Sequence, residues 1–300
     1  MIYKLLLLAI LRLSKIAVIP VPSRKLRHKI RDVVRARVLP LYFRLRYLPQ
    51  LETPARAKGA SANTIWQLWL QGEKNAPPIV AACFRSVEKF KGGHEHKILD
   101  ADKLSKLINL PDYVEEKYRR GKISAQHYSD LARLELLYKY GGVWMDATCF
   151  MTAPMPEHLT KLDFFVFHTG ENGIGSGYSM FQNCFIVAKK GNPLIARWRQ
   201  MCLEFWRSES STPEYFFCQL MLRTLVLYNA EAAREYVKMP RLSQDPTHVF
   251  CHDSTHDLYG KFDKWEWGEL TAGSFFQKLR HDREPPPESS VAWAVERGLV

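Results

Sequence analysis

The sequence places a carboxylate, Asp146, at the end of the short apolar segment 143–145, directly after a glycine pair. A carboxylate that follows a buried strand is costly to bury alone, so Asp146 should meet a cation, a hydrogen-bond donor or solvent in a cleft. Upstream, Asp130 and Arg133 lie three residues apart, which puts both on one face of a helix. A helix, a glycine turn and a strand would therefore bring two carboxylates and one guanidinium to the same region.

Such a group suits a divalent cation that bridges a diphosphate. Mg²⁺ or Mn²⁺ needs few protein carboxylates when phosphate oxygens and water complete its coordination shell. The pattern alone leaves another interpretation open, in which Asp130 and Arg133 form an ordinary helix ion pair and Asp146 caps a loop.

The elements that must position these residues alternate between strands and helices. Strands are expected at 64–69, 96–100, 143–147, 163–168 and 184–188, and helices at 78–90, 103–107, 111–118, 125–140 and 193–207. Ser124 is suited to cap the helix at 125–140, and the glycine pair 141–142 is suited to end it. This order predicts an α/β fold with a mostly parallel sheet covered by helices on both faces. In such sheets ligands bind beyond the carboxyl ends of the strands, where Asp146 lies.

The positive charge of the chain is confined to its N-terminal part. Residues 1–58 hold 14 Lys/Arg and 2 Asp/Glu, which accounts for the whole net charge of +12. The rest of the chain is balanced, so a nucleic-acid groove on the main domain is excluded. We expect three regions: a basic amphipathic arm (1–58), the main domain (59–280) and a flexible or loosely docked tail (281–300) that begins with a proline run.

Three interpretations compete for residues 1–22. A signal peptide would need a small-residue cleavage site, but prolines and a basic run follow the apolar stretch. A spanning helix would bury Arg12 and Lys15 at about 2.5–3.5 kcal/mol each. Lys4, Arg12 and Lys15 instead fall within about 80° of one another around a helix. The pattern therefore favours an amphipathic helix that lies in the plane of the membrane.

A second amphipathic helix is expected over 26–41, with Pro40 as its end. Basic residues near an anionic leaflet contribute about 1 kcal/mol each, so the arm predicts a peripheral protein on the cytoplasmic face of the inner membrane. The alternative is a helix pair that packs on the main domain with a solvated basic face. Six scattered cysteines without a Cys-x-x-Cys pair exclude a zinc ribbon and a disulfide scaffold, and they favour a reducing compartment.

The central segment of the chain contains a recognisable motif. Residues 129–148, Ser-Asp-Leu-Ala-Arg-Leu-Glu-Leu-Leu-Tyr-Lys-Tyr-Gly-Gly-Val-Trp-Met-Asp-Ala-Thr, closely resemble the signature of the bacterial capsular polysaccharide synthesis family. That family is similar to glycosyltransferase family 32, which has a Ser-Asp-x-x-Arg helix, a Gly-Gly turn and an Asp-x-Asp motif. Weaker likeness covers 65–69, 110–113, 121–124, 183–193 and the Ser-x-x-x-Lys-Leu segment at 274–279.

The resemblance implies a GT-A-like single Rossmann-type domain and a nucleotide-diphosphate sugar as donor. It implies catalytic or donor-proximal roles for Asp130, Arg133 and Asp146. The implied donor-binding residues are Ile65, Trp66, Gln67, Ser129, Gly142 and Asn183.

The motif departs from Asp-x-Asp at its last position, where Thr148 stands. A hydroxyl can ligate a metal but brings no charge, so a further ligand is expected from elsewhere. A histidine in the C-terminal part is a recurrent metal ligand in such folds, which draws attention to His252, Asp253 and His256. His252 is the candidate third ligand of Mn²⁺ or Mg²⁺ beside Asp146 and Thr148, and the alternative is that these three residues form a polar surface loop. His94 and His96 are instead expected to be exposed to solvent.

The resulting hypothesis is a metal-assisted glycosyltransferase that moves a hexose, with retention, to a cell-surface glycan or lipid-linked glycan such as capsule or lipopolysaccharide. Two alternatives stay open. A metal-dependent phosphoesterase or nucleotidyltransferase could use the same carboxylates, and a non-catalytic membrane-bound assembly factor would explain the arm without Asp146.

Overall fold

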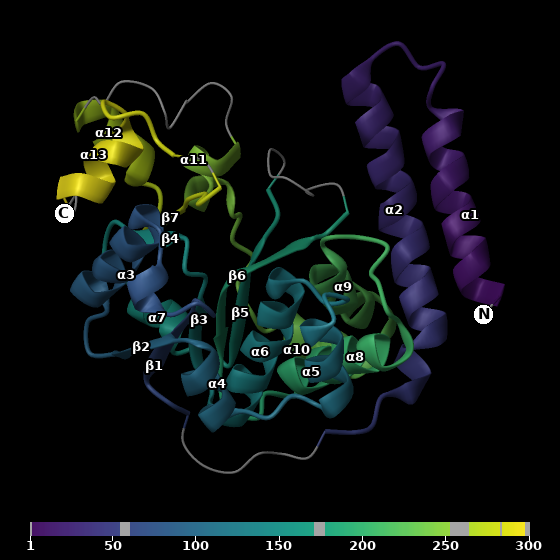
Figure 1. The fold of residues 1–300 in the computed structure, drawn as a ribbon. Coiled ribbons are helices and arrows are strands. Elements are labelled where there is room, and N and C mark those ends of the chain that lie inside the picture. Colours follow the sequence, from purple (N-terminus) through teal and green to yellow (C-terminus); the bar gives the residue numbers. More distant parts are fainter. Residues whose placement is uncertain (1, 55–60, 171–177, 253–263, 283, 298–300) are drawn as a thin grey trace.

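A five-stranded sheet forms the centre of the chain in the computed structural model, which describes residues 2–54, 61–170, 178–252, 264–282 and 284–297 (Figure 1). In spatial order its strands are β2 (Glu95–Leu99), β1 (Thr64–Leu68), β3 (Gly142–Met145), β6 (Phe181–Ala188) and β5 (Phe164–His168). β1 runs parallel to β2 and β3, whereas β6 is antiparallel to both β3 and β5.

The α/β class is thus confirmed, but the mostly parallel sheet is wrong, because the sheet is mixed. β5 and β6 follow one another in the chain and pair directly, and an antiparallel pair needs no crossover helix between its strands. The apolar content of these strands predicted their burial but carried no information on their direction.

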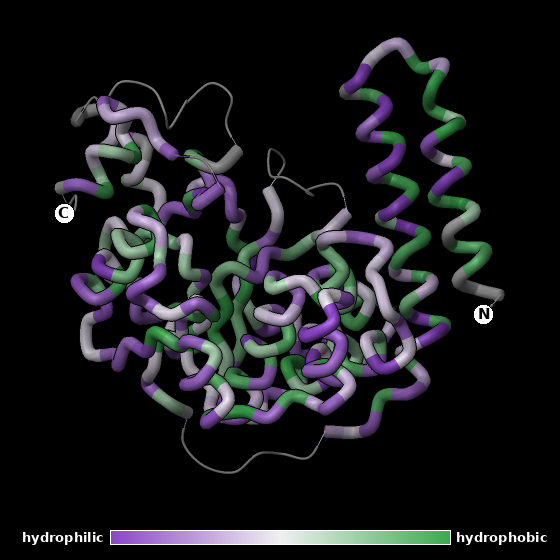
Figure 2. The backbone as a smooth tube through the Cα atoms, viewed as in Figure 1, coloured by the Kyte–Doolittle hydropathy of each residue, from purple (hydrophilic) through white to green (hydrophobic). Residues whose placement is uncertain are grey.

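Both faces of the sheet are covered, because consecutive residues of a strand point to opposite sides. Trp66 and Trp144 enter a core with the helices of one face, while their neighbours Ile65 and Val143 enter a core on the other face. Figure 2 shows the resulting concentration of hydrophobic residues along the central strands.

The helices that carry most of this cover have the following bounds. They are α3 (Pro78–Phe90), α4 (Ala101–Leu107), α5 (Asp112–Arg119), α6 (Ala125–Tyr140), α7 (Glu157–Thr160), α8 (Pro193–Ser208), α9 (Phe217–Tyr228), α10 (Ala230–Tyr236), α11 (Val249–His252), α12 (Lys264–Thr271) and α13 (Ser290–Arg297). Short 3-10 turns lie at Leu48–Gln50, Glu73–Asn75 and Asp245–Thr247.

The helix that precedes Asp146 has the predicted bounds. The Ser124 hydroxyl accepts a hydrogen bond from the backbone N–H of His127 at 3.3 Å, which caps the first turn of α6. Gly141 ends the helix with φ of 72°, a value that favours glycine. The chain then turns directly into β3.

A second, two-stranded sheet brings the C-terminal part of the chain to the end of β3. β4 (Cys149–Met151) pairs antiparallel with β7 (Phe276–Lys278), and Cys149 is the partner of Lys278 in the register. The Leu279 N–H also donates to the Thr148 carbonyl at 2.8 Å. Residues 276–279 therefore lie beside the Asp146–Thr148 segment despite their distance in sequence.

The N-terminal part forms a hairpin of α1 (Ile2–Ala17) and α2 (Arg24–Arg46), which stands at one side of the sheet domain (Figure 1). The predicted helix end at Pro40 is wrong, because α2 continues through it to Arg46. A proline inside a helix costs about 3 kcal/mol. Burial of Leu39, Phe43 and Tyr47 in the core offsets that cost. Within the described part of the chain, no helix has both the length and the apolar run that crossing a bilayer requires.

Part of the region predicted as a flexible or loosely docked tail (281–300) forms a helix. The described residues after 283 include α13, and its Val291 and Ala294 side chains are buried against α3. The proline run before it is a connection between two packed elements.

Candidate functional site

A pocket of about 510 Å³ opens at the carboxyl ends of β1 and β3. Its walls come from the segment after β1, the first half of α6, the segment after β3, the start of β6, α9 and the segment after β7. Six of the predicted site residues line it: Ser129, Asp130, Arg133, Asp146, Thr148 and Asn183. The structure therefore brings together residues from separate parts of the sequence.

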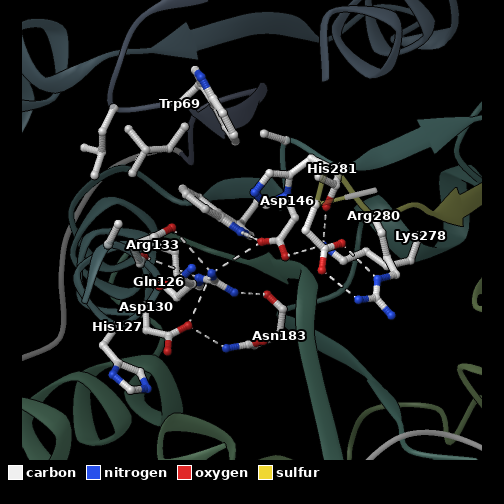
Figure 3. A pocket seen from close by; sticks show the side chains of 18 of the residues that line it. Trp69, Gln126, His127, Asp130, Arg133, Asp146, Asn183, Lys278, Arg280 and His281 are labelled. Atoms are coloured by element: carbon white, nitrogen blue, oxygen red, sulfur yellow. Dashed lines mark hydrogen bonds and ion pairs between the residues drawn. The ribbon is translucent and has the colours of Figure 1, made fainter. Parts of the chain in front are cut away.

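Arg133 is the centre of the buried charge in this pocket (Figure 3). Its Nη2 lies 3.2 Å from Asp130 Oδ1 and 3.3 Å from Asp146 Oδ1, and its Nη1 donates to the Asn183 carbonyl. The guanidinium also lies over the Trp144 ring at 4.9 Å. Arg133 of α6 thus pairs with two carboxylates, Asp130 of the same helix and Asp146 at the end of β3.

Asp146 has further partners on each of its carboxylate oxygens. Trp144 Nε1 donates to Oδ1 at 2.8 Å, and Lys278 Nζ donates to Oδ2 at 2.8 Å. The same Nζ donates to the Thr148 hydroxyl at 2.5 Å. Asp146 therefore lies between two cations, one from α6 and one from β7.

Burial and the neighbouring charges shift the pKa values of Asp130 and Asp146 in opposite directions. Burial would raise the pKa of Asp146, but Lys278 and Arg133 outweigh it and hold that pKa below its usual range. For Asp130 burial prevails over Arg133 and raises the pKa. Burial would lower the pKa of Lys278, and the Asp146 charge raises it instead. Asp146 is therefore the firmly ionised member of the two acids.

A layer behind the pocket fixes the backbone of Asp146. The Gln67 side chain is fully buried; its Nε2 donates to the Asp146 carbonyl at 3.1 Å, and its Oε1 lies 2.8 Å from His96 Nε2. His96 Nδ1 in turn lies 3.1 Å from Glu88 Oε2. The prediction of a solvent-exposed His96 is wrong, because only 2% of its side chain is exposed. His94 is half-buried, so it is not fully exposed either.

A chain of amides supports Asp130 from the other side. Asn183 Nδ2 donates to Asp130 Oδ1 at 2.8 Å, and Gln219 Nε2 donates to Asn183 Oδ1 at 2.9 Å. Both amide side chains are buried and line the pocket. They fix the orientation of Asp130, which in turn orients Arg133.

Four predicted donor-binding residues do not line the pocket: Ile65, Trp66, Gln67 and Gly142. Ile65 is fully buried in the core, and Trp66 is nearly so, with Nε1 donating to the Gly141 carbonyl at 2.9 Å. Gln67 acts only through the contacts described above. β1 is a central strand covered on both faces, so a ligand can reach only the segment at and beyond its carboxyl end, residues 68–71.

Gly142 has a structural role beyond the helix end that the sequence predicted for the glycine pair. Its φ is 103°, and a Cβ there would lie 2.5 Å from the Thr64 carbonyl oxygen of β1. The close approach of the two strands needs glycine at this position.

We therefore expect Gly142→Ala to lower the free energy of unfolding by about 3 kcal/mol, because it combines backbone strain with a clash. Gly121→Ala is the matched control, since Gly121 has φ of 67° and a Cβ added there would meet no atom within 4 Å. Urea denaturation of both variants measures the difference. Equal destabilisation of the two would show that the approach to Thr64 carries no free energy.

The structure describes the side chains of two of the three predicted metal ligands. Asp146 and Thr148 share the pocket, and their oxygens both accept from Lys278. His252 ends α11, and its side chain lies outside the described residues, as do Asp253 and His256. Among the described residues, no group of three His, Cys, Asp or Glu side chains has the arrangement of a metal site. A bound Mn²⁺ or Mg²⁺ ion at Asp146 and Thr148 stays a prediction.

Sequence reasoning assigned no role to several residues of the pocket. Lys278 is the main one, and the others include Trp69, Gln126, Tyr215, Gln219, Arg280 and His281. The Ser-x-x-x-Lys-Leu segment at 274–279 was the signal for Lys278, because it lies inside the region of family likeness. Nothing in the local pattern pointed to Gln219, which faces the site from the long apolar helix α9.

Comparison with known proteins agrees with the resemblance of the central segment. O-glycosyltransferase braB of Annulohypoxylon truncatum is 28% identical over 165 residues, which cover 49% of this chain and 38% of that protein. O-glycosyltransferase PaGT of Phomopsis amygdali is 24% identical over 228 residues, which cover 68% of this chain and 55% of that protein. The match thus spans about half or less of the length of these relatives.

A solved structure, the PaToxG glycosyltransferase, is similar over 70% of this chain and 85% of its own, with a TM-score of 0.40 and 14% identity. The sequence profile of one family covers nearly the entire chain, from residue 23 to residue 292. That range includes the helix α6, the glycine turn, Asp146 and Lys278. The chain belongs to the capsular polysaccharide synthesis protein family.

Proposed function

We propose that this protein is a glycosyltransferase that transfers a hexose from a nucleotide-diphosphate sugar to a hydroxyl of a glycan or lipid-linked glycan. The observation that carries the proposal is the ionised carboxylate of Asp146, held between Arg133 and Lys278 at the floor of the pocket. Family membership and the relatives' names support the same class of reaction. A GT-A-like binding mode, with the donor beyond the carboxyl ends of β1 and β3, fits this placement.

The volume and chemistry of the pocket suit such a donor. Ligand pockets usually measure about 300–1,000 Å³, and this one lies within that range. Asp146 is 22% exposed at its side chain, so its carboxylate can accept hydrogen bonds from donor hydroxyls. We expect residues 68–71, which line the pocket at and beyond the end of β1, to contact the base.

The proposed transfer breaks the bond between the anomeric carbon and the diphosphate oxygen, and the electron pair leaves with the diphosphate. The acceptor hydroxyl oxygen forms the new bond, and its proton passes to the departing diphosphate on the same face of the sugar. Retention of configuration follows from this geometry. Asp130 and Asp146 are both committed to ion pairs, which supports a route in which neither acts as a nucleophile. Fixed cations of the pocket stabilise the charge on the leaving group.

Direct binding tests the proposal. Purified protein is screened by thermal shift against a panel of sugar nucleotides, and the best ligand is measured by calorimetry. We expect one sugar nucleotide to raise the unfolding temperature, and the matching nucleoside diphosphate to compete with it, since binding to the native state stabilises it. A panel without any stabilising sugar nucleotide would refute the proposal.

We further propose that the α1–α2 hairpin attaches the protein peripherally to an anionic membrane surface on the cytoplasmic side. Apolar side chains of α1 are exposed, among them Leu5, Leu13 and Ile16 at about 60% each. Basic residues lie between them in the sequence, and Figure 2 shows hydrophobic and hydrophilic segments alternating along both helices. Exposed apolar area with adjacent cations is the combination that binds anionic bilayers.

We expect the protein to float with vesicles that contain phosphatidylserine and to stay behind with vesicles of phosphatidylcholine alone. Replacing Leu13 and Ile16 by Glu should abolish flotation, because it removes apolar area and adds negative charge. Val237→Glu is the control, since Val237 is 74% exposed outside the hairpin. Unchanged flotation of the Leu13/Ile16 double variant would contradict this proposal.

A further inference from the structure

The position between Asp146 and Thr148, where the Asp-x-Asp resemblance would put a divalent cation, is filled by a side chain of the protein. Lys278 Nζ donates to Asp146 Oδ2 at 2.8 Å and to Thr148 Oγ1 at 2.5 Å. We propose that the Lys278 ammonium takes the place of the metal ion and is the cation that binds the donor diphosphate. This inference rests on the proposed function for the identity of the ligand.

The contacts at Asp146 do not fit a divalent cation. Mg²⁺ binds oxygen ligands at about 2.1 Å, and an ion bound to both Asp146 Oδ2 and Thr148 Oγ1 would have to lie next to the ammonium group that contacts the same two oxygens, whose positive charge repels it. The other oxygen of Asp146 accepts from Trp144 Nε1 and lies 3.3 Å from Arg133. The second ligand of the motif, the Thr148 hydroxyl, brings no charge that would favour a metal over an ammonium.

The nearby carboxylate of Asp130 does not complete a metal site either. Asp130 is 7% exposed, and its Oδ1 lies 3.2 Å from Arg133 and accepts from Asn183. Each carboxylate of the cluster is therefore matched by a cation of the chain, Asp130 by Arg133 and Asp146 by both Arg133 and Lys278.

The backbone holds Lys278 in this position. Lys278 is the last residue of β7, is paired with Cys149 of β4, and is followed by the Leu279 N–H bond to the Thr148 carbonyl. The side chain is 19% exposed, so most of its stem is covered while its end reaches the pocket. The entropy of ordering a long lysine side chain is thus lost on folding and not on ligand binding.

The ammonium retains capacity for a ligand. A lysine has three N–H donors, and two of them serve Asp146 and Thr148. The third can donate to a phosphate oxygen, as a point charge that is already in place when the donor binds. The replacement of Asp-x-Asp by Asp-x-Thr is consistent with an ammonium group in place of a divalent metal ion, because a monovalent cation needs one carboxylate fewer.

Two measurements without sugar nucleotide test the inference. In the first, Mn²⁺ is titrated into wild-type protein and Asp146→Asn and followed by electron paramagnetic resonance. We expect the two proteins to bind Mn²⁺ alike, because Lys278 occupies the oxygens that a metal would need. Mn²⁺ binding that is lost in Asp146→Asn would overturn the inference.

In the second measurement, inorganic pyrophosphate is titrated calorimetrically in the presence of EDTA. We expect Lys278→Met to weaken binding by about tenfold to a hundredfold and Lys278→Arg to retain most of it, as for a lost charge-assisted hydrogen bond. Lys161→Met controls for general charge, since Lys161 is 71% exposed beside α7. Pyrophosphate binding that needs Mn²⁺, or that is unchanged in Lys278→Met, would also overturn the inference.

Lys278→Met should fold, because Asp146 keeps Arg133 and Trp144 as partners. Its thermal unfolding and Mn²⁺ binding report on the site independently of any sugar nucleotide. If the panel of sugar nucleotides shows no binding, the proposed function fails, whereas the Mn²⁺ result still decides the identity of the cation at Asp146.

Discussion

Asp146→Asn is expected to weaken binding of the sugar nucleotide on the order of 100-fold or more, because charged acceptors of hydrogen bonds are lost. The amide is isosteric and can still accept the hydrogen bond from Trp144 Nε1. It removes the charge that holds Lys278 and Arg133 in place. Isothermal titration with the ligand selected by the thermal-shift panel measures the effect, and turnover is expected to fall with it.

Asp163→Asn is the matched control for this variant. Asp163 forms an ion pair with Lys189, but its side chain is 64% exposed and lies outside the pocket. We expect unchanged ligand binding in this control. Equal affinity of wild-type protein and Asp146→Asn would mean that the pocket floor does not bind the donor.

Arg133→Met is expected to have the largest effect on stability, with a loss of about 3–5 kcal/mol in the free energy of unfolding, because it leaves buried carboxylates without their shared cation. Arg133 is 5% exposed and contacts Asp130, Asp146 and the Asn183 carbonyl. Asp146 keeps Lys278 as an ion-pair partner, so most of the loss in the free energy of unfolding comes from the unpaired carboxylate of Asp130.

A second substitution distinguishes this cause from lost packing. Adding Asp130→Asn to Arg133→Met should recover part of the stability, since it removes the uncompensated charge. Arg120→Met serves as a surface control, because the Arg120–Glu116 pair is exposed and should contribute less than about 1 kcal/mol. Denaturation midpoints in urea measure all three variants. A double variant no more stable than Arg133→Met would contradict the charge explanation.

The helix that presents the site could be predicted from sequence to the residue. Both ends of this helix depend only on neighbouring residues. The Ser124 hydroxyl accepts a hydrogen bond from a backbone N–H of the first turn, and Gly141 readily adopts the backbone angle that ends the helix. The position of Asp146 at the end of a buried strand followed from the same kind of local pattern.

Strand direction could not be predicted in this way. The residues of β5 and β6 show that the strands are buried, but whether β6 runs with or against β3 depends on contacts between segments far apart in the chain. The same holds for Pro40, whose local tendency to end a helix is outweighed by burial of Leu39 and Phe43.

The site itself was predicted in part. Ser129, Asp130, Arg133, Asp146, Thr148 and Asn183 meet in one pocket, as the family likeness implied. Lys278 follows Asp146 by 132 residues and reaches it only because β7 pairs with β4. His96 was misjudged because its glycine-rich surroundings suggest a surface turn, whereas its ring fits between Gln67 and Glu88.

In the proposed reaction, the pocket at Asp146 cleaves the bond between a sugar and a nucleoside diphosphate. Mass spectrometry of the products, after incubation of wild-type protein with the bound sugar nucleotide and a panel of glycan acceptors, tests it most directly. We expect a nucleoside diphosphate together with an acceptor that has gained one hexose, and loss of both products in Asp146→Asn. A nucleoside monophosphate with sugar phosphate would identify a phosphoesterase or nucleotidyltransferase instead, and would rule out glycosyl transfer at this pocket.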